Sequence, residues 1–236
     1  MTQPHTPRVV AVICARNEAP SIGPIIQGSL QRVDEVLVLD AHSTDGTPDI
    51  ARNLGATVVQ DEAPGKGAAI RQAIRIAHAD ILVFLDADGS HDPADIPRLL
   101  EPLLSDRADM VIGSRVEGGS DELLSIHHFF RRVGSWIIRA SVNRHFRVRL
   151  TDIQNGFRAA RLSILRDLDL REDIFTIEQE MTIKALRRGY RIINVPAREY
   201  ERKHGRSRIS VPRHGWRYVV SWLKYTYFQH DRPAQP

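Results

Sequence analysis

The stretch ILVFLDADGSHDP, residues 81 to 93, joins a short apolar run to a cluster of acidic residues. The run over residues 81 to 85 is typical of a buried strand. Asp86 and Asp88 follow it directly, before the turn residue Gly89. Two carboxylates at the end of a buried strand are costly to desolvate unless a cation meets them. Because Mg²⁺ and Mn²⁺ prefer carboxylate oxygens, the stretch indicates a divalent-metal site, with an acidic turn that binds nothing as the alternative.

The first half of the chain repeats this pattern of a short apolar run with a polar end. The further strands that it predicts cover residues 8–15, 35–40, 57–60 and 109–114. Helix-like stretches separate them, which predicts an α/β fold with a mostly parallel sheet flanked by helices. Ligands bind at the carboxyl ends of such strands, so a site is expected among the polar residues there. These residues are Arg16, Glu18, Asp40, Asp86, Asp88 and Arg115.

A glycine-rich segment, GKGAAIR at residues 65 to 71, follows the third strand that the sequence predicts. It matches neither the Walker A pattern nor GxGxxG, so neither of these nucleotide-binding fingerprints is predicted. Its backbone N–H groups and Lys66 are nevertheless expected to suit an anion at the start of a helix.

The two halves of the chain carry opposite net charge. Residues 1–126 hold 10 Lys and Arg against 19 Asp and Glu (−9), and residues 127–236 hold 23 against 10 (+13). An acidic part that suits a cation therefore precedes a basic part that suits nucleic acid, anionic lipid or phosphorylated substrates. The single cysteine, Cys14, lies in an apolar run, which favours a core position and excludes an internal disulfide.

Two stretches of the basic half are amphipathic. Residues 122–146 read as one long helix with several arginines, and residues 216–228 are rich in aromatic side chains. Such stretches pack on the domain or lie on an anionic membrane surface, and the sequence leaves both open. Residues 202–208 form a basic loop, which is either solvated surface or a lid over phosphates. No run reaches the roughly 18 apolar residues that span a bilayer, and the N-terminus does not resemble a signal peptide.

The ordered motifs resemble those of family 2 glycosyltransferases with the GT-A (Rossmann-like) fold, above all dolichol-phosphate mannosyltransferases and related polyprenyl-phosphate glycosyltransferases. The matching segments are ICARNEA at 13–19, LDAHSTDGT at 39–47, GKGAAIR at 65–71, DADGSHDP at 86–93, GSR at 113–115, TDIQNGFRA at 151–159, EQEMTIKALRRGYRIINVP at 178–196 and RKHGRSR at 202–208. The resemblance implies one GT-A domain over residues 8–228, which includes the basic amphipathic stretches near the C-terminus. The low-complexity tails at 1–7 and 229–236 are expected to be disordered. Residues 8–117 would bind the nucleotide sugar, and residues 118–228 would bind the acceptor and face the membrane.

The resemblance also assigns roles to the matching residues. Those expected to bind the nucleotide sugar are Ala15, Arg16, Asn17, Glu18, Asp40, Lys66, Asp86, Ala87, Asp88, Arg202, Ser207 and Arg208. Those expected to act in catalysis are Asp86, Asp88, Arg115 and Arg131, of which the two arginines would face the acceptor phosphate. Mg²⁺ or Mn²⁺ is the expected cofactor, held by Asp86, Asp88 and Ser90 and bridging the diphosphate. Residues 178–180 would fall near the sugar.

The activity that the resemblance implies is metal-dependent transfer of a sugar from GDP-mannose or a UDP-sugar to polyprenyl (dolichyl or undecaprenyl) phosphate, with inversion. The alternatives are a soluble sugar or sugar-phosphate acceptor on the same fold, and a non-catalytic protein that binds membranes or polyanions. The expected location is cytoplasmic and peripheral at the membrane face, reached directly or through a membrane-protein partner, with no nucleic-acid partner. Ala41 replaces a usual second acidic residue, and Ser90 replaces a frequent glutamine, so both positions leave the donor open.

Overall fold

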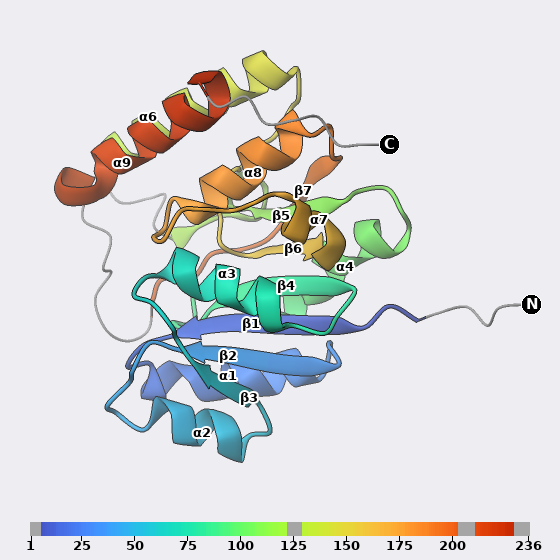
Figure 1. The fold of residues 1–236 in the computed structure, drawn as a ribbon, viewed down its shortest axis with the longest axis vertical. Helices are drawn as coiled ribbons and strands as arrows, with labels where there is room; N and C mark the ends of the chain where they lie inside the picture. The colour runs from blue at the N-terminus through green and yellow to red at the C-terminus, as the bar shows by residue number, and fades with distance from the viewer. Residues whose placement is uncertain (1–5, 122–128, 203–210, 229–236) are drawn as a thin grey trace, which may run out of the picture.

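A seven-stranded sheet forms the centre of the described part of the protein (Figure 1). The computed structural model describes residues 6–121, 129–202 and 211–228. The strands are β1 (Val9–Ala15), β2 (Glu35–Asp40), β3 (Thr57–Gln60), β4 (Ile81–Asp86), β5 (Met110–Ser114), β6 (Arg158–Arg161) and β7 (Ile192–Pro196). They lie in the order β3-β2-β1-β4-β6-β5-β7. The predicted strands at residues 35–40 and 57–60 are confirmed residue for residue, and those at 8–15, 81–85 and 109–114 to within one residue.

Strand β6 interrupts an otherwise parallel sheet. It runs antiparallel between β4 and β5, whereas the other strand pairs of the described sheet are parallel. The predicted α/β class with a mostly parallel sheet is therefore confirmed. The sequence does not predict β6, because its four residues, RAAR, contain no apolar run.

Helices cover both faces of the sheet. Those on one face are α1 (Ala19–Leu30), α2 (Thr47–Asn53) and α4 (Ile96–Leu104), with the short η1 (Pro93–Asp95) before α4. Those on the other face are α3 (Lys66–Ile76), α7 (Leu162–Asp167) and α8 (Ile177–Arg187), and the short α5 (Arg115–Gly118) follows β5. Each face has its own apolar core, because successive strand residues point to opposite sides of the sheet. Val10 and Val12 join the α3–α8 core, and Ala11 and Ile13 join the α1–α4 core.

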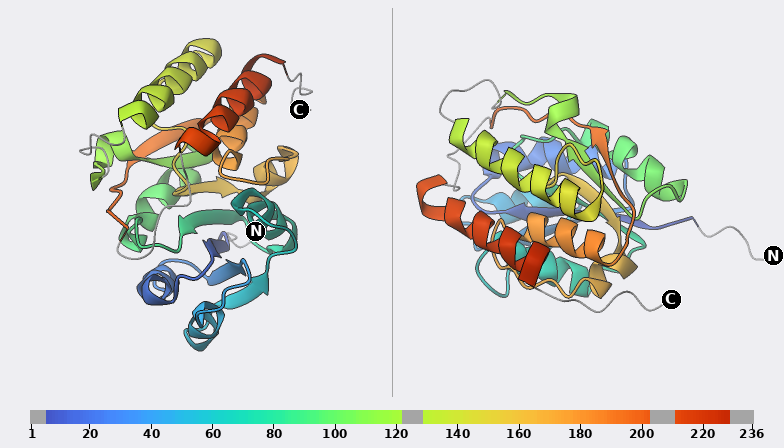
Figure 2. Two further views of the ribbon diagram at one scale, coloured as in Figure 1. Left: turned by 90° about the vertical axis from the view of Figure 1, so that its left-hand side faces the viewer. Right: turned by 90° about the horizontal axis from the view of Figure 1, so that it is seen from above.

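Helices α6 (Phe129–Phe146) and α9 (Val211–Leu223) lie side by side outside α8 and form an outer layer (Figure 2). Helix α9 continues into η4 (Lys224–Phe228), a π-helical turn whose Tyr225 is buried in the core beside α8. The predicted helix over 122–146 is confirmed from Phe129 onward, and its first seven positions lie outside the described residues. None of the described helices is long and apolar enough to cross a membrane.

Candidate functional site

The carboxyl ends of β1, β2 and β4 meet at one edge of the sheet, which we call the sheet edge. The strand register places Cys14 beside Asp86 and Ala15 beside Asp40, so the acidic ends of β2 and β4 flank β1. Cys14 packs against the core as predicted, and burial raises the pKa of its thiol to about 12. A thiol with so high a pKa is a poor nucleophile.

Lys66 joins two carboxylates that come from different elements. Asp86 ends β4, Lys66 begins α3, and Glu178 lies in the first turn of α8. The Nζ of Lys66 lies 2.5 Å from Asp86 Oδ1 and 2.8 Å from Glu178 Oε1. Gly156 makes room for the group, since a Cβ there would lie 2.8 Å from Nζ and 3.2 Å from Asp86 Oδ2. A side chain at position 156 would therefore push this cluster apart.

The charges in this cluster stabilise one another. Burial alone would raise the pKa of Asp86, but the Lys66 ammonium outweighs this and holds the pKa below its ordinary value. Burial alone would lower the pKa of Lys66, but Asp86 and Glu178 raise it. The second oxygen of Glu178, Oε2, is buried and has no hydrogen-bond partner among the described residues. A hydroxyl or N–H group of a ligand would relieve that unmet acceptor.

The backbone at the start of α3 does not face an anion, contrary to the expectation from the sequence. The N–H groups of Gly67 and Ala68 donate to the carbonyl of Asp173 at 2.8 and 3.2 Å. A Cβ at Gly65 or Gly67 would lie 2.2 Å from a backbone oxygen of residues 172–173. The two glycines are thus needed for this close backbone contact, and it is the side chain of Lys66 that reaches the sheet edge.

Asp88 is held by its own turn and by an arginine from far along the chain. Its Oδ1 accepts hydrogen bonds from the N–H and the hydroxyl of Ser90, at 3.0 and 2.6 Å. Its Oδ2 lies 2.6 Å from Nη2 of Arg202. The other terminal nitrogen of Arg202, Nη1, lies 3.2 Å from Glu18 Oε1. Arg202 therefore links two segments that the sequence predicts to bind the donor.

The residues at this edge fit a divalent cation. Asp86 and Asp88 offer hard oxygen ligands, and the hydroxyl of Ser90 lies beside Asp88. Side-chain nitrogens of Lys66 and Arg202 already lie 2.5 and 2.6 Å from the two carboxylates. Among the described residues, no three His, Cys, Asp or Glu side chains are grouped so that they could hold a metal ion. A metal ion here would complete its coordination with oxygens of a substrate or of water.

The turn after β1 is fixed to the turn after β2. The N–H of Asn17 donates to the hydroxyl of Ser43, and the N–H of Thr44 donates to the side chain of Asn17. The N–H of Glu18 donates to the hydroxyl of Thr47. Of the four residues predicted to bind the nucleotide here, Ala15 ends β1, and Arg16, Asn17 and Glu18 form a defined turn at the sheet edge. Ala15 is buried, and Arg16 is exposed.

Asp40 and Asp61 place two buried carboxylates at the ends of β2 and β3. Asp40 Oδ2 accepts from the N–H of Ser43 at 3.1 Å. The Oδ1 atoms of both aspartates are buried without a hydrogen-bond partner among the described residues. Burial, and then the nearby charge of Asp40, raise the pKa of Asp61 to about 6. Asp61 was not among the predicted site residues, although it follows a predicted strand directly, and an acidic residue at a strand end is the signal that marked Asp40.

His91 fixes the acidic turn to the loop before β6 and was also missed. Its Nδ1 lies 3.4 Å from the backbone N of Asp86, and its Nε2 lies 3.1 Å from Asn155 Oδ1. These contacts suit a ring that accepts at Nδ1 and donates at Nε2. The ring stacks on Phe157, with 5.1 Å between the ring centroids. The turn that carries Asp88 is thus anchored by a buried histidine.

Arg115, which was predicted to contact an acceptor phosphate, is paired with two carboxylates in this structure. Its Nε lies 2.6 Å from Asp152 Oδ2, and its Nη2 donates to Oδ1 at 3.1 Å. Glu199 Oε1 is a more distant partner at 3.5 Å. The flanking carboxylates raise the pKa of Arg115 despite its burial, so it is always charged. The remaining predicted residues lie where no side chain is described, Arg131 in the first turns of α6, and Ser207 and Arg208 outside the described residues.

The chain is similar to known glycosyltransferases. The family model "Glycosyl transferase family 2" matches residues 10–169. An undecaprenyl-phosphate mannosyltransferase of Micrococcus luteus is 35% identical over 219 residues, which cover 86% of this chain and 88% of that protein. The glycosyltransferase AglJ of Haloferax volcanii is 34% identical over 85% of this chain and 66% of its own length. A dolichyl-phosphate hexose transferase of Haloferax volcanii is 29% identical over 86% of this chain and 87% of its own length.

Solved structures share the fold. Glucosyl-3-phosphoglycerate synthase from Mycobacterium tuberculosis, in complex with Mn²⁺, uridine diphosphate and glucosyl-3-phosphoglycerate, gives a TM-score of 0.75 at 23% identity. The match covers 95% of this chain and 82% of that one, and at this identity it concerns the fold alone. The family model covers more than half of the chain, and a relative above 30% identity covers most of it. The chain therefore belongs to glycosyltransferase family 2, and the protein is a glycosyltransferase with the GT-A fold.

Proposed function

We propose that this glycosyltransferase moves a hexose from a nucleoside-diphosphate sugar to a polyprenyl phosphate, with Mg²⁺ or Mn²⁺ and with inversion at the anomeric carbon. The observation that carries the proposal is the pair Asp86 and Asp88 at the sheet edge, with Lys66 and Arg202 beside them. Two carboxylates flanked by two cations suit a metal-bound diphosphate, whose negative charge grows as it leaves the sugar. Relatives named for undecaprenyl and dolichyl phosphate support the acceptor class.

The donor would lie along the sheet edge from β3 to β4. The unpaired oxygens of Asp40 and Asp61 suit hydroxyl and N–H donors of the ribose and base. Asp86 and Asp88 would hold the metal ion, which when bound supplies positive charge to the leaving diphosphate. The cationic side chains beside them would donate charge-assisted hydrogen bonds to phosphate oxygens. Glu178, through its unpaired Oε2, would accept from a hydroxyl of the transferred sugar.

The acceptor needs positioning more than a general base. A phosphate monoester is already a nucleophile at neutral pH, and arginine binds its oxygens in a fixed geometry. We assign Arg115 and Arg131 to this phosphate. Of the two carboxylate partners of Arg115, the more distant Glu199 is the one that an acceptor phosphate would replace.

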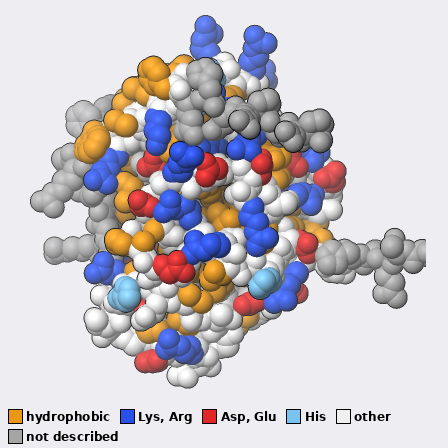
Figure 3. Space-filling view, viewed as in Figure 1, with side chains coloured by type: hydrophobic (Ala, Val, Ile, Leu, Met, Phe, Trp, Pro, Cys, Tyr) orange, Lys and Arg blue, Asp and Glu red, His pale blue; other side chains and the backbone are white. Residues whose placement is uncertain are grey.

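The outer layer offers a surface for the lipid part of the acceptor. Exposed apolar side chains lie on α6, α9 and η4, and those over α9 are visible at the upper left of Figure 3. They are Val133, Trp136, Ile137, Trp216, Val219, Val220, Leu223, Tyr227 and Phe228. Tryptophan and tyrosine favour the interface between a bilayer and water, and the basic second half favours anionic lipid headgroups. We infer peripheral contact with the cytoplasmic face of a membrane there, directly or beside a membrane protein, and no nucleic-acid partner.

The test is a transfer assay with defined substrates. The purified protein is incubated with radiolabelled GDP-mannose, UDP-glucose or other hexose donors, a short-chain polyprenyl phosphate and MnCl₂. We expect labelled lipid from one donor class, no product in excess EDTA, recovery with Mn²⁺ or Mg²⁺, and an inverted anomer by NMR. An unchanged rate in EDTA would contradict the metal requirement. Transfer to soluble sugars or sugar phosphates but never to the lipid would replace the acceptor class.

A further inference from the structure

Both carboxylates of the acidic turn already have a cation bound to them. Asp86 Oδ1 lies 2.5 Å from Nζ of Lys66, and Asp88 Oδ2 lies 2.6 Å from Nη2 of Arg202. One partner of each ion pair is largely shielded from water, since the side chains of Asp88 and Lys66 are 10% and 12% exposed. Their partners, Arg202 and Asp86, are 27% and 30% exposed. Shielded ion pairs are costly to break unless both partners find new ones. A divalent ion that arrives alone would therefore compete with two internal cations.

Each of these cations has a second carboxylate outside the acidic turn. Lys66 also pairs with Glu178 at 2.8 Å, and Arg202 also pairs with Glu18 at 3.2 Å. Neither Glu178 nor Glu18 belongs to the predicted metal ligands, so both pairs can persist when the aspartates change partner. When a metal ion replaces Lys66 and Arg202 at the two aspartates, each cationic side chain then needs to move only a short way, because it keeps its second carboxylate.

The charge balance favours one kind of incoming ligand. A divalent ion alone would add two positive charges next to Lys66 and Arg202, which repel it. A metal–diphosphate complex brings phosphate oxygens as well, and these oxygens give both displaced cations new charge-assisted hydrogen bonds. The complex therefore satisfies Asp86 and Asp88 through the metal and Lys66 and Arg202 through the phosphates.

We propose that Lys66 and Arg202 occupy the metal ligands of the free enzyme and make the site selective for a metal–diphosphate complex over the metal ion alone. The inference rests on the proposed function, because it takes Asp86 and Asp88 as the metal ligands. It adds that metal and nucleotide bind together, with strong positive coupling. Removal of either cation should uncouple them and raise the affinity for the bare ion.

The test is Mn²⁺ binding, measured from the EPR signal of the free ion with no sugar or acceptor present. Titrations are run with Mn²⁺ alone and with saturating UDP or GDP. We expect the wild-type protein to bind Mn²⁺ alone at least about tenfold more weakly than with one of the nucleotides, a coupling of the size common between linked sites. Lys66→Met and Arg202→Gln should each tighten binding of Mn²⁺ alone several-fold and reduce this coupling.

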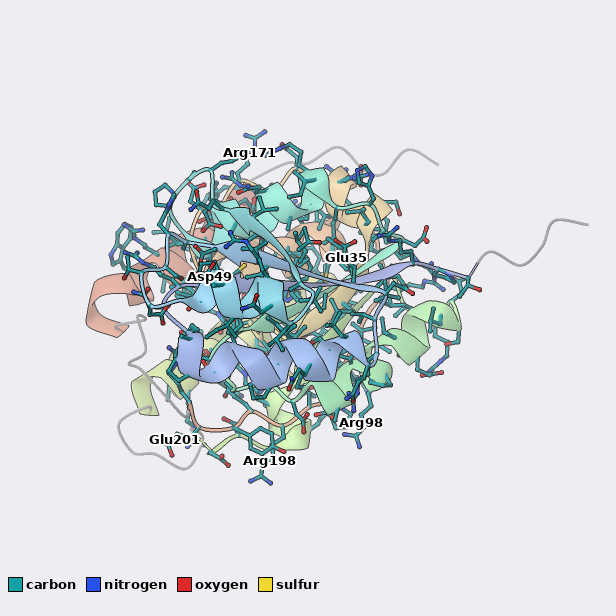
Figure 4. All side chains as sticks on the ribbon, turned by 90° about the horizontal axis from the view of Figure 1, so that it is seen from below. Glu35, Asp49, Arg98, Arg171, Arg198 and Glu201 are labelled. Carbon is teal, nitrogen blue, oxygen red and sulfur yellow. The ribbon has the colours of Figure 1, made fainter. Side chains whose placement is uncertain are left out.

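Arg198→Gln is the matched control. Arg198 lies four positions before Arg202 and points outward at the surface (Figure 4), where it pairs with Asp121. Its replacement should change neither the affinity nor the coupling, and thermal melting of each variant verifies folding. If Lys66→Met does not fold, Arg202→Gln decides alone, since Arg202 is 27% exposed.

Two results would overturn this inference. One is wild-type affinity for Mn²⁺ that is equal with and without nucleotide, and the other is unchanged or weaker binding of Mn²⁺ alone in folded Arg202→Gln. These outcomes leave the proposed function intact, because neither involves transfer. Conversely, coupled Mn²⁺ binding without any sugar transfer would overturn the proposed function and support the coupling.

Discussion

The sheet edge and the α6–α9 layer use their cationic side chains in different ways. At the edge, Lys66 and Arg202 each bridge two carboxylates. In the outer layer, Arg139 donates to the carbonyl of Thr151, and Arg217 lies over the ring of Trp216. The negative charge of the carboxylates offsets the positive potential of a paired cation until a ligand displaces them. A cation that contacts only a carbonyl or an aromatic ring has no such offset. The contrast favours a selective internal site at the edge and an attractive anion-binding surface on the outer layer.

Replacement of Asp86 at the sheet edge is expected to have the largest effect on activity. Asp86→Asn should lower kcat by about 10²- to 10³-fold, because the leaving diphosphate loses charge stabilisation. Thermal melting should change little, since Lys66 keeps Glu178 as a partner. Steady-state transfer assays and melting curves measure both effects. Asp49→Asn, at a side chain that is 76% exposed on α2, is the matched control, and a normal kcat in Asp86→Asn would remove Asp86 from the site.

A methyl group at position 156 tests whether the geometry of the edge cluster matters. Gly156→Ala should reduce the transfer rate by about 10- to 100-fold, because its Cβ would lie 2.8 Å from Nζ of Lys66 and displace it. The control is Gly134→Ala in α6, where a Cβ would meet nothing within 4 Å. That change should leave transfer intact and stabilise the helix by roughly 0.5–1 kcal/mol. Equal rates in the two variants would show that the cluster tolerates displacement.

Membrane binding tests whether the α6–α9 layer is the surface that contacts anionic lipid. Trp136→Ser should weaken co-sedimentation with phosphatidylglycerol vesicles about tenfold, because a 59% exposed aromatic side chain no longer enters the interface. Transfer to a short, water-soluble polyprenyl phosphate should stay within twofold of wild type. Leu104→Ser on α4, at a side chain that is 54% exposed on the opposite face of the sheet, is the control. Vesicle binding that falls equally in both variants would assign no special role to the layer.

The smallest expected effect concerns Asp61 and pH. Burial raises its pKa in the folded protein to about 6, above the ordinary value of 3.8. Protonated Asp61 therefore contributes fully to the stability of the folded state below about pH 3.8, and this contribution is lost as pH rises through about 6. Asp61→Asn should thus stabilise the nucleotide-free protein relative to wild type at pH 7.5, by on the order of 1–3 kcal/mol, and less at pH 4.5. Melting curves at the two pH values check this, and a pH-independent difference would exclude a raised pKa.

The parts of the fold that could be predicted from sequence are those with a local pattern. The apolar runs at residues 35–40 and 57–60 are long enough to identify β2 and β3, and the acidic residues after residue 85 mark the sheet edge. Strand β6 is not predicted, because the sequence RAAR is typical of polar surface although Arg158 is fully buried. Its guanidinium is satisfied by the carbonyl oxygens of Asn155 and Glu178, which no local pattern reveals.

The partners within the site are the other part that local patterns cannot supply. Arg202 and Glu18 are 184 positions apart, yet their side chains form an ion pair. Lys66 reads as an anion-binding residue at a helix start, but its partners are carboxylates of β4 and α8. Charge type and strand position thus identify the participants, whereas their pairing depends on long-range packing.

The placement of β6 has a consequence for the way the chain folds during synthesis. In the described sheet, β5 pairs with β6 and β7, and β6 joins it to β4. A nascent chain that has not reached residue 158 therefore has no strand to connect β5 to the rest of the sheet. Residues 8–117 carry most of the predicted donor contacts but contain only part of the sheet. Completion of the sheet must wait for its late central strand, and such long loop closures are slow.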